Sequence, residues 1–366
     1  MVDFLKRNSA SQLWVGMKNV IAAFALTSCT SPGVDVGAVE SSIKPGDQDC
    51  PIHDCGTNST IIDGVYFSDL NLHGAPNGSG IVFDGYESLP AGAVALDVRG
   101  NKLVAVNAAN ATVAGAEDLV GTVFRLRNAD KSYHVRIAAM QRSSYWAANH
   151  GRRVEVYRFQ YSDPAALGAR SPRELCVSDN DSGVLALDAV VFAGDRYDPS
   201  TKDVDPTPGS GWINIACLGG APAKMHLMRH TAASQDPHQG ITTTENERQA
   251  LFNAWTGNYC GDGRSFTRTG EKVRIRDSQG WLAYDSGRSW ADASELSSYE
   301  AIWNETGAVC LNVPRLEDSE PGTYNEILAW CSDVGHPLPP CSATPDSYPA
   351  GWQQTGHILT ANPVGS

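Results

Sequence analysis

A cysteine, two histidines and an aspartate offer the most direct catalytic chemistry in this sequence. Cys260 lies two residues before Asp262, and His226 and His230 precede both of them in the chain. A thiolate that is activated by an imidazole, which a carboxylate orients, is the arrangement of cysteine hydrolases. The sequence therefore admits a hydrolase that uses Cys260, His226 and Asp262. This hypothesis requires that Cys260 carry a free thiol.

The same histidines are candidates for a metal site. His226 and His230 are four residues apart, a spacing at which two side chains share one face of a helix, and His238 would be a third ligand. No glutamate lies between them, so the HExxH pattern of zinc proteases is absent. We therefore expect two polar residues on an amphipathic helix and no metal site.

Carboxylates that recur along one segment would suit calcium, which prefers oxygen ligands. The acids of this segment are Asp179, Asp181, Asp188, Asp195, Asp198, Asp203 and Asp205. The calcium-binding loop that closes with a glutamate is missing. We expect solvated loop carboxylates and no cofactor, with a structural Ca²⁺ as the alternative that the sequence leaves open.

Aromatic residues gather beside acids in a later segment. They are Trp281, Tyr284, Trp290 and Tyr299, interspersed with Asp277, Asp285 and Asp292. Exposed rings next to carboxylates would bind a sugar, whereas the same rings packed in a core would only add buried area. The second explanation is favoured, and a polysaccharide partner is the alternative.

The composition describes a folded, acidic protein. The chain has 366 residues, of which 42% are hydrophobic and 19% are charged, and its formal net charge is -13. The hydrophobic share is enough for a core, which excludes a wholly disordered chain. A nucleic-acid partner is excluded, because phosphate binding needs a basic face. The length suits two modest domains.

The N-terminal residues have the features of a lipoprotein signal. Lys18 precedes the apolar run Val20–Leu26, which is too short to span a bilayer and which leads directly to Thr27-Ser28-Cys29. This pattern resembles a bacterial lipobox, in which the cysteine receives the lipid. We expect lipid attachment at Cys29.

This interpretation sets the location and the first boundaries. We expect residues 1–29 to be the signal, with translation starting at Met17, and residues 30–49 to be a flexible tether. The expected location is extracytoplasmic in the bacterial cell envelope, at the outer membrane or cell surface. The lipid anchor is then the only contact with the membrane.

The number of cysteines fits an exported protein. Lipidation of one of the nine leaves eight, which is typical of up to four disulfides in an oxidising compartment. The eight candidates are Cys50, Cys55, Cys176, Cys217, Cys260, Cys310, Cys331 and Cys341. Among the many possible pairings, joining sequence neighbours predicts Cys50–Cys55, Cys176–Cys217, Cys260–Cys310 and Cys331–Cys341. Zinc is the rival explanation, but no CxxC pair exists.

Short alternating strands predict the architecture of residues 50–170. Candidate strands are Ile61–Phe67, Gly80–Phe83, Val94–Val98, Leu103–Val106, Thr122–Arg127, Tyr133–Met140 and Val154–Tyr161. Turn residues separate several of them, so we expect an antiparallel β sandwich or barrel-like domain.

Residues 171–345 combine strands and helices. Val184–Phe192, Trp212–Cys217 and Lys272–Arg276 are predicted strands. Helices are predicted over 221–230, from the capped start at Thr244 to about Trp255, and over 324–330. We expect a mixed, disulfide-stabilised α+β domain and an irregular tail over 346–366, so that the whole fold is α+β and mostly β.

One motif in this second domain carries a family resemblance. Gly257-Asn258 is followed by Tyr259, Cys260, Gly261, Asp262 and Gly263, a tight turn that leads into a strand. The motif resembles that of the ADYC domain family of bacterial surface proteins, as do the blocks CPIHDCGTNST, ACLGGAPAKM and AIWNETGAVCLNVPR. Gly257-Asn258 replaces the Ala-Asp of the family name, so we expect position 258 to be structural. The resemblance implies architecture and location rather than a reaction.

Together these patterns favour a lipid-anchored envelope protein that is not an enzyme. We expect it to bind a protein or polysaccharide partner or to act structurally. The hydrolase that uses Cys260, His226 and Asp262 is the alternative.

Overall fold

A computed structural model describes residues 60–62, 65–145, 153–164, 172–176, 187–235, 242–267, 273–277, 299–341 and 356–362, all of them in the compact unit Val36–Ser366. Several predictions lie outside these residues. They are the signal and tether with Cys29, the Cys50–Cys55 pair, Asp179, Asp181, His238, Trp281, Tyr284, Trp290, Asp285 and Asp292.

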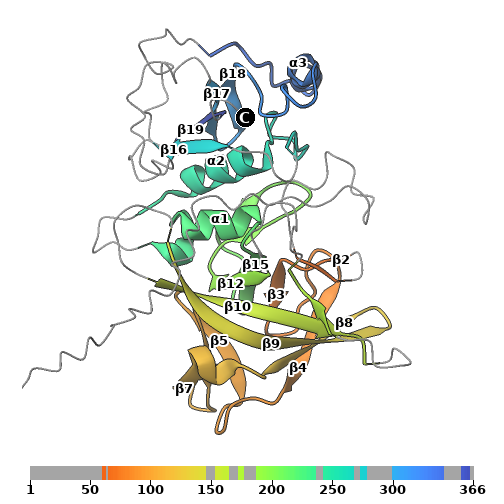
Figure 1. Ribbon diagram of the computed structural model, residues 1–366, viewed down its shortest axis with the longest axis vertical. Helices are drawn as coiled ribbons and strands as arrows, with labels where there is room; N and C mark the ends of the chain where they lie inside the picture. The colour runs from red at the N-terminus through yellow and green to blue at the C-terminus, as the bar shows by residue number, and fades with distance from the viewer. Residues whose placement is uncertain are drawn as a thin grey trace, which may run out of the picture. The chain divides into compact units, whose positions relative to one another are not determined.

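An antiparallel sheet of eight strands forms the centre of the described fold and curls strongly (Figure 1). Its order is β3 (Asp69–Asn71), β15 (Trp212–Cys217), β12 (Asp188–Ala193), β10 (Arg153–Ser162), β9 (Lys131–Ser144), β8 (Val123–Asn128) and β4 (Ile81–Glu87), with β11 (Arg173–Glu174) paired to β10. The predicted alternation of apolar and polar residues is visible in β8, where Phe124 and Leu126 are buried and Arg125 and Arg127 are exposed. The expected mostly β, α+β class is confirmed.

Smaller sheets are also present among the described residues. A three-stranded sheet contains β5 (Ala95–Arg99), β6 (Lys102–Val106) and β7 (Thr112–Gly115), followed by the short helix η1 (Ala116–Leu119). A four-stranded sheet has the order β16 (Arg274–Asp277), β19 (Ile358–Ala361), β17 (Tyr299–Asn304) and β18 (Gly307–Leu311). Two hairpins are β1 (Ile61–Ile62) with β2 (Val65–Tyr66) and β13 (Arg196–Tyr197) with β14 (Val204–Asp205).

Strand β12 separates two hydrophobic cores because its side chains alternate between the faces of the central sheet. Val190 and Phe192 face a core shared with the helices, and Ala189 and Val191 face a core inside the curled sheet. All four are buried, which explains why this strand appears in the sequence as a continuous apolar run.

Within the described ranges, three α-helices lie beside the sheets: α1 (Ala221–Leu227), α2 (Glu245–Thr256) and α3 (Thr323–Asp333), with the short helix η2 (Ala232–Ser234) after α1. The predicted cap of α2 is present, since Thr244 and Glu247 each bond the other's backbone amide. Helix α1 is shorter than predicted. It ends at Leu227, and Arg229 adopts a positive φ of 65°, so residues 228–230 leave the helix. No described helix is long and apolar enough to cross a membrane.

The C-terminal tail differs from the prediction of irregular chain. Ile358–Ala361 form β19, which pairs with both β16 and β17. Ile358 and Leu359 are fully buried. Their burial stabilises β19 within the sheet, although the sequence around them has few features that predict a strand.

Candidate functional site

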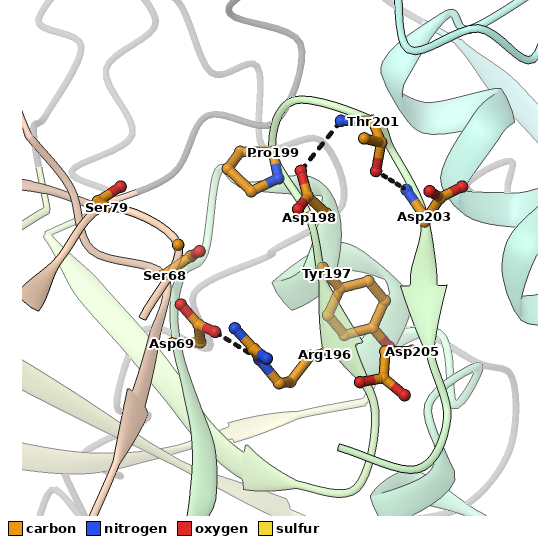
Figure 2. Close-up of a pocket in the computed structure, with 11 residues that line it drawn as sticks. Ser68, Asp69, Ser79, Arg196, Tyr197, Asp198, Pro199, Thr201, Asp203 and Asp205 are labelled. Carbon is orange, nitrogen blue, oxygen red and sulfur yellow. Dashed lines mark hydrogen bonds and ion pairs between the residues drawn. The ribbon is translucent and has the colours of Figure 1, made fainter. Parts of the chain in front are cut away.

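A cavity of about 320 Å³ lies between the β13–β14 hairpin and the segment that runs from Ser68 to Ser79. Its lining residues are Ser68, Asp69, Gly78, Ser79, Arg196, Tyr197, Asp198, Pro199, Thr201, Asp203 and Asp205. Figure 2 shows Ser68, Asp69 and Ser79 on one side and the hairpin residues on the other. The structure thus brings three acids of the calcium hypothesis, Asp198, Asp203 and Asp205, to one cavity.

Two of the lining residues form an ion pair. Arg196 Nε lies 2.7 Å from Asp69 Oδ2 and points toward it across the cavity (Figure 2). The Arg196 guanidinium also stacks on Trp212, with its central carbon 3.6 Å from the ring centre. Burial raises the pKa of Asp69, and Arg196 opposes this rise without cancelling it. The Arg196 guanidinium is therefore already engaged in an ion pair with Asp69 and a stacking contact with Trp212.

The hairpin tip is rigidly bonded within itself. Asp198 Oδ1 accepts hydrogen bonds from the amides of Ser200 at 2.7 Å and Thr201 at 3.0 Å. Lys202 is buried and has a positive φ of 62°, and its ammonium group donates a hydrogen bond to the Pro199 carbonyl. These bonds present Asp198 and Asp203 at the edge of the cavity on a preformed turn.

A chain of side-chain amides ties this hairpin to the end of helix α2. Gln249 accepts from the Val204 amide at 2.7 Å and donates to the Lys202 carbonyl at 2.8 Å. Gln249 also donates to Asn253 Oδ1 at 3.1 Å, and the same oxygen accepts from Asn258 Nδ2 at 3.1 Å. Gln249 and Asn253 can bond each other because they lie one turn apart on α2. Through these polar bonds, helix α2 supports the wall of the cavity.

The Gly-Asp-Gly motif also contacts the hairpin. Asn258 Oδ1 accepts the Gly263 amide at 3.1 Å. Gly263 has a φ of 90°, and a Cβ placed on it would lie 2.5 Å from the Ser200 carbonyl oxygen. Only glycine allows this approach of two backbones. Asn258 thus has the structural role expected for position 258.

Tyr259 anchors the motif in the interior. Its hydroxyl donates to Glu300, which is fully buried and accepts two bonds from the Arg315 guanidinium, from Nε to Oε1 at 2.7 Å and from Nη2 to Oε2 at 2.9 Å. Burial alone would raise the pKa of Glu300, but the Arg315 guanidinium and the hydrogen bonds outweigh it and hold that pKa below its usual value. Arg315 also donates to the Ala254 carbonyl at 2.8 Å, so this buried group joins α2, the motif and β17.

Three disulfides cross-link the described chain. Cys176–Cys217 is the neighbour pair that the sequence predicts. The predicted Cys260–Cys310 and Cys331–Cys341 pairs are wrong, because Cys260 bonds Cys331 and Cys310 bonds Cys341. The reason is tertiary: helix α3 returns to the motif, and Trp330 on that helix donates to Asp262 Oδ2 at 2.7 Å.

The proposed catalytic residues do not come together in a reactive group. Cys260 is in a disulfide, and Asp262 accepts from Trp330 and from the Arg264 amide. His226 is fully buried and stacked on Phe192 at 4.4 Å, and its Nδ1 lies 2.9 Å from Thr231 Oγ1. Burial, aided by the nearby Arg229, lowers the pKa of His226 to about 3. His226 is therefore a neutral core residue.

The predicted histidine pair also separates. His230 lies beyond the end of α1, so the two rings do not share a helix face as predicted. His230 Nε2 lies 3.1 Å from Asp277 Oδ2, and both side chains are 1% exposed. Within the described ranges, no three His, Cys, Asp or Glu residues lie close enough to hold a metal ion.

Several residues of the site were not singled out from the sequence. They are Ser68, Asp69, Arg196, Gln249, Asn253, Glu300 and Trp330. One signal was available for a partner of Glu300, since Arg315 ends the last block that carries the family resemblance. The polar bonds of Gln249 and Asn253 give no pattern that distinguishes them from a solvated helix face.

The ADYC domain family model matches residues 116–317, a range that contains the motif, the hairpin, α2 and the Glu300–Arg315 pair. No curated protein and no solved structure matches the chain. The chain belongs to the ADYC domain family.

Proposed function

We propose that this ADYC domain protein is a non-enzymatic binding protein of the bacterial cell envelope, held at the outer membrane or cell surface by a lipid on Cys29. Its ligand occupies the cavity beside the β13–β14 hairpin. This ligand is a small molecule, or it is part of a protein or polysaccharide of the envelope.

The observation that carries this proposal is how the motif residues are used. Tyr259 bonds Glu300, Cys260 bonds Cys331, and Gly263 lies against the hairpin tip. Every one of these contacts supports a wall of the cavity or the core behind it. A motif used in this way favours a preformed binding site over a reaction centre.

The three disulfides support an extracytoplasmic location. Disulfides persist in oxidising compartments and are rare in the cytosol of ordinary bacteria. The lipid anchor is proposed from the lipobox-like residues that end at Cys29.

The hydrolase alternative is weaker on the same geometry. Its thiolate would have to come from Cys260, whose sulfur is bonded to Cys331. Its base would be His226, which is fully buried against Phe192.

Intact mass tests the anchor and the thiol. We expect membrane-extracted protein to carry acyl mass on the peptide that begins at Cys29 and to take no alkyl group without prior reduction. Alkylation of Cys260 in the unreduced protein would overturn the non-enzymatic assignment.

A ligand panel of sugars, amines and carboxylates tests the cavity. Gly78 lines the cavity, and a side chain there would meet nothing within 4 Å, so Gly78→Leu fills the opening without straining the backbone. Ala75→Leu, at an exposed position outside the lining, is the matched control. We expect at least one probe to raise the melting temperature of the wild type and of Ala75→Leu but not of Gly78→Leu. If every probe acts equally on all three proteins, the cavity is not the binding site.

A further inference from the structure

We infer that the cavity beside the β13–β14 hairpin takes a small organic cation with more than one ammonium group. This inference rests on the proposed binding function and names the class of its ligand.

The balance of charge around the cavity favours a cation. The Asp69 carboxylate offsets Arg196 through their ion pair. Asp198 Oδ1 already accepts hydrogen bonds from the Ser200 and Thr201 amides, and these bonds, with a smaller contribution from the Lys202 charge, lower the pKa of that carboxyl against its partial burial. Asp203 and Asp205 line the same cavity and are exposed, and no described cation forms an ion pair with either of them. Two negative charges are therefore available to a ligand.

The hydroxyl of a nearly buried serine adds a polar contact inside the cavity. Ser68 is only 7% exposed, it lines the cavity, and no described residue bonds its hydroxyl. Figure 2 places it beside Asp69, on the side opposite Asp198 and Pro199. Because solvent reaches Ser68 Oγ through the cavity, the hydroxyl is open to a hydrogen bond from a ligand. An ammonium N–H that donates to Ser68 Oγ would satisfy it while another ammonium group reaches the carboxylates.

The spacing of the acids disfavours a metal ion. Among the described residues, no three acidic or imidazole side chains lie close enough to coordinate one ion. A cavity of about 320 Å³ instead admits a molecule of several heavy atoms, whose separated charges match separated carboxylates. An anion is disfavoured as well, because the Arg196 guanidinium already bonds Asp69 and stacks on Trp212.

Spermidine is the probe for this inference, measured by titration calorimetry on the full chain at low ionic strength. We expect saturable binding to the wild type and about tenfold weaker binding to Asp203→Asn/Asp205→Asn, because two exposed ion pairs are lost. Added salt should weaken the wild-type binding. The amide keeps an oxygen at Asp205 for its bond from the Thr207 amide, so the loop is retained.

Asp118→Asn/Asp130→Asn is the matched control, since it removes the same charge at exposed positions outside the cavity lining. We expect it to bind spermidine as the wild type does. Equal weakening in both double variants would reduce the effect to net charge and overturn the inference.

Three further probes separate this inference from the proposed function. They are Ca²⁺, sucrose and succinate, tested on the wild type and on Gly78→Leu. If one of them binds and is lost in Gly78→Leu while spermidine does not bind, the cation is the wrong ligand class but the cavity is a binding site. If no probe of either panel binds, the inference and the cavity's binding role both fail.

Discussion

Gly263 of the family motif and Ser200 of the hairpin tip meet backbone to backbone. A Cβ on Gly263 would lie 2.5 Å from the Ser200 carbonyl oxygen and 3.1 Å from the Thr201 Cα. The same motif is also connected to the Lys202 carbonyl, in the turn of the hairpin, through Asn258, Asn253 and Gln249. The motif therefore determines the position of the wall that carries Asp198, Asp203 and Asp205.

Replacing Gly263 should disturb both stability and the cavity. Gly263→Ala places a Cβ against backbone at a φ of 90°, so we expect the free energy of unfolding to fall by about 2 kcal/mol or more. Urea denaturation measures this change. Gly78→Ala is the control, because a Cβ there meets nothing within 4 Å, and it should leave stability within about 0.5 kcal/mol of the wild type. Similar losses in both variants would contradict the close approach of motif and hairpin.

Removing one partner of the buried Glu300–Arg315 pair should lower the stability of the protein strongly. Glu300→Gln leaves the Arg315 charge uncompensated in the core, and we expect a loss of about 3–5 kcal/mol in the free energy of unfolding at neutral pH. Glu326→Gln removes a carboxylate that is 50% exposed and pairs with Arg264, and it should cost about 1 kcal/mol or less.

The same pair predicts a dependence on pH. The pKa of Glu300 is lowered from its ordinary value of 4.5, so its contribution is complete above that value and is lost as the pH falls through the folded-state pKa. The difference in stability between the wild type and Glu300→Gln should therefore shrink in acid. A difference that stays constant down to the acid transition would argue against a charged Glu300 in the folded protein.

His226 predicts a second pH dependence, at higher pH. Its pKa falls from 6.5 to about 3 on folding, so the unfolded chain binds more protons between these values and stability declines as the pH falls below 6.5. At pH 5 we expect this effect to amount to about 2 kcal/mol. His226→Phe retains an aromatic ring against Phe192 but does not titrate, so its stability should change less between pH 7 and pH 5. An unchanged pH dependence would exclude His226 as its source.

The disulfide at the motif should contribute strongly to stability. Cys260 and Cys331 are 71 residues apart, and the loop-closure model gives about 4 kcal/mol for a bond of this separation. We expect Cys260→Ser/Cys331→Ser to lower the midpoint of urea unfolding. The same double variant should also weaken the binding of any ligand that occupies the cavity. Wild-type stability in this double variant would mean that the packing of α3 alone holds the motif.

Local patterns in the sequence determined much of the secondary structure. The alternation in β8, β9 and β10, the cap at Thr244 and the turn glycines each reflect neighbours along the chain, and the structure agrees with them. Such features depend on side-chain periodicity and backbone freedom, which are read without knowing the fold. The length of α1 is an exception, because the helix ends at Leu227 and Arg229 beyond it adopts a positive φ that no local pattern predicts.

The candidate site depended on contacts between distant residues. Arg196 pairs with Asp69 across 127 positions, and Trp330 reaches Asp262 across 68. Cys260 forms its disulfide with Cys331 rather than with its sequence neighbour Cys310, because α3 packs against the motif. The residue types predicted that this acidic chain forms disulfides, and they carry the family motif. Only the tertiary structure decided which carboxylates face one cavity and that the motif supports its wall, because burial and pairing arise from segments that the fold alone brings together.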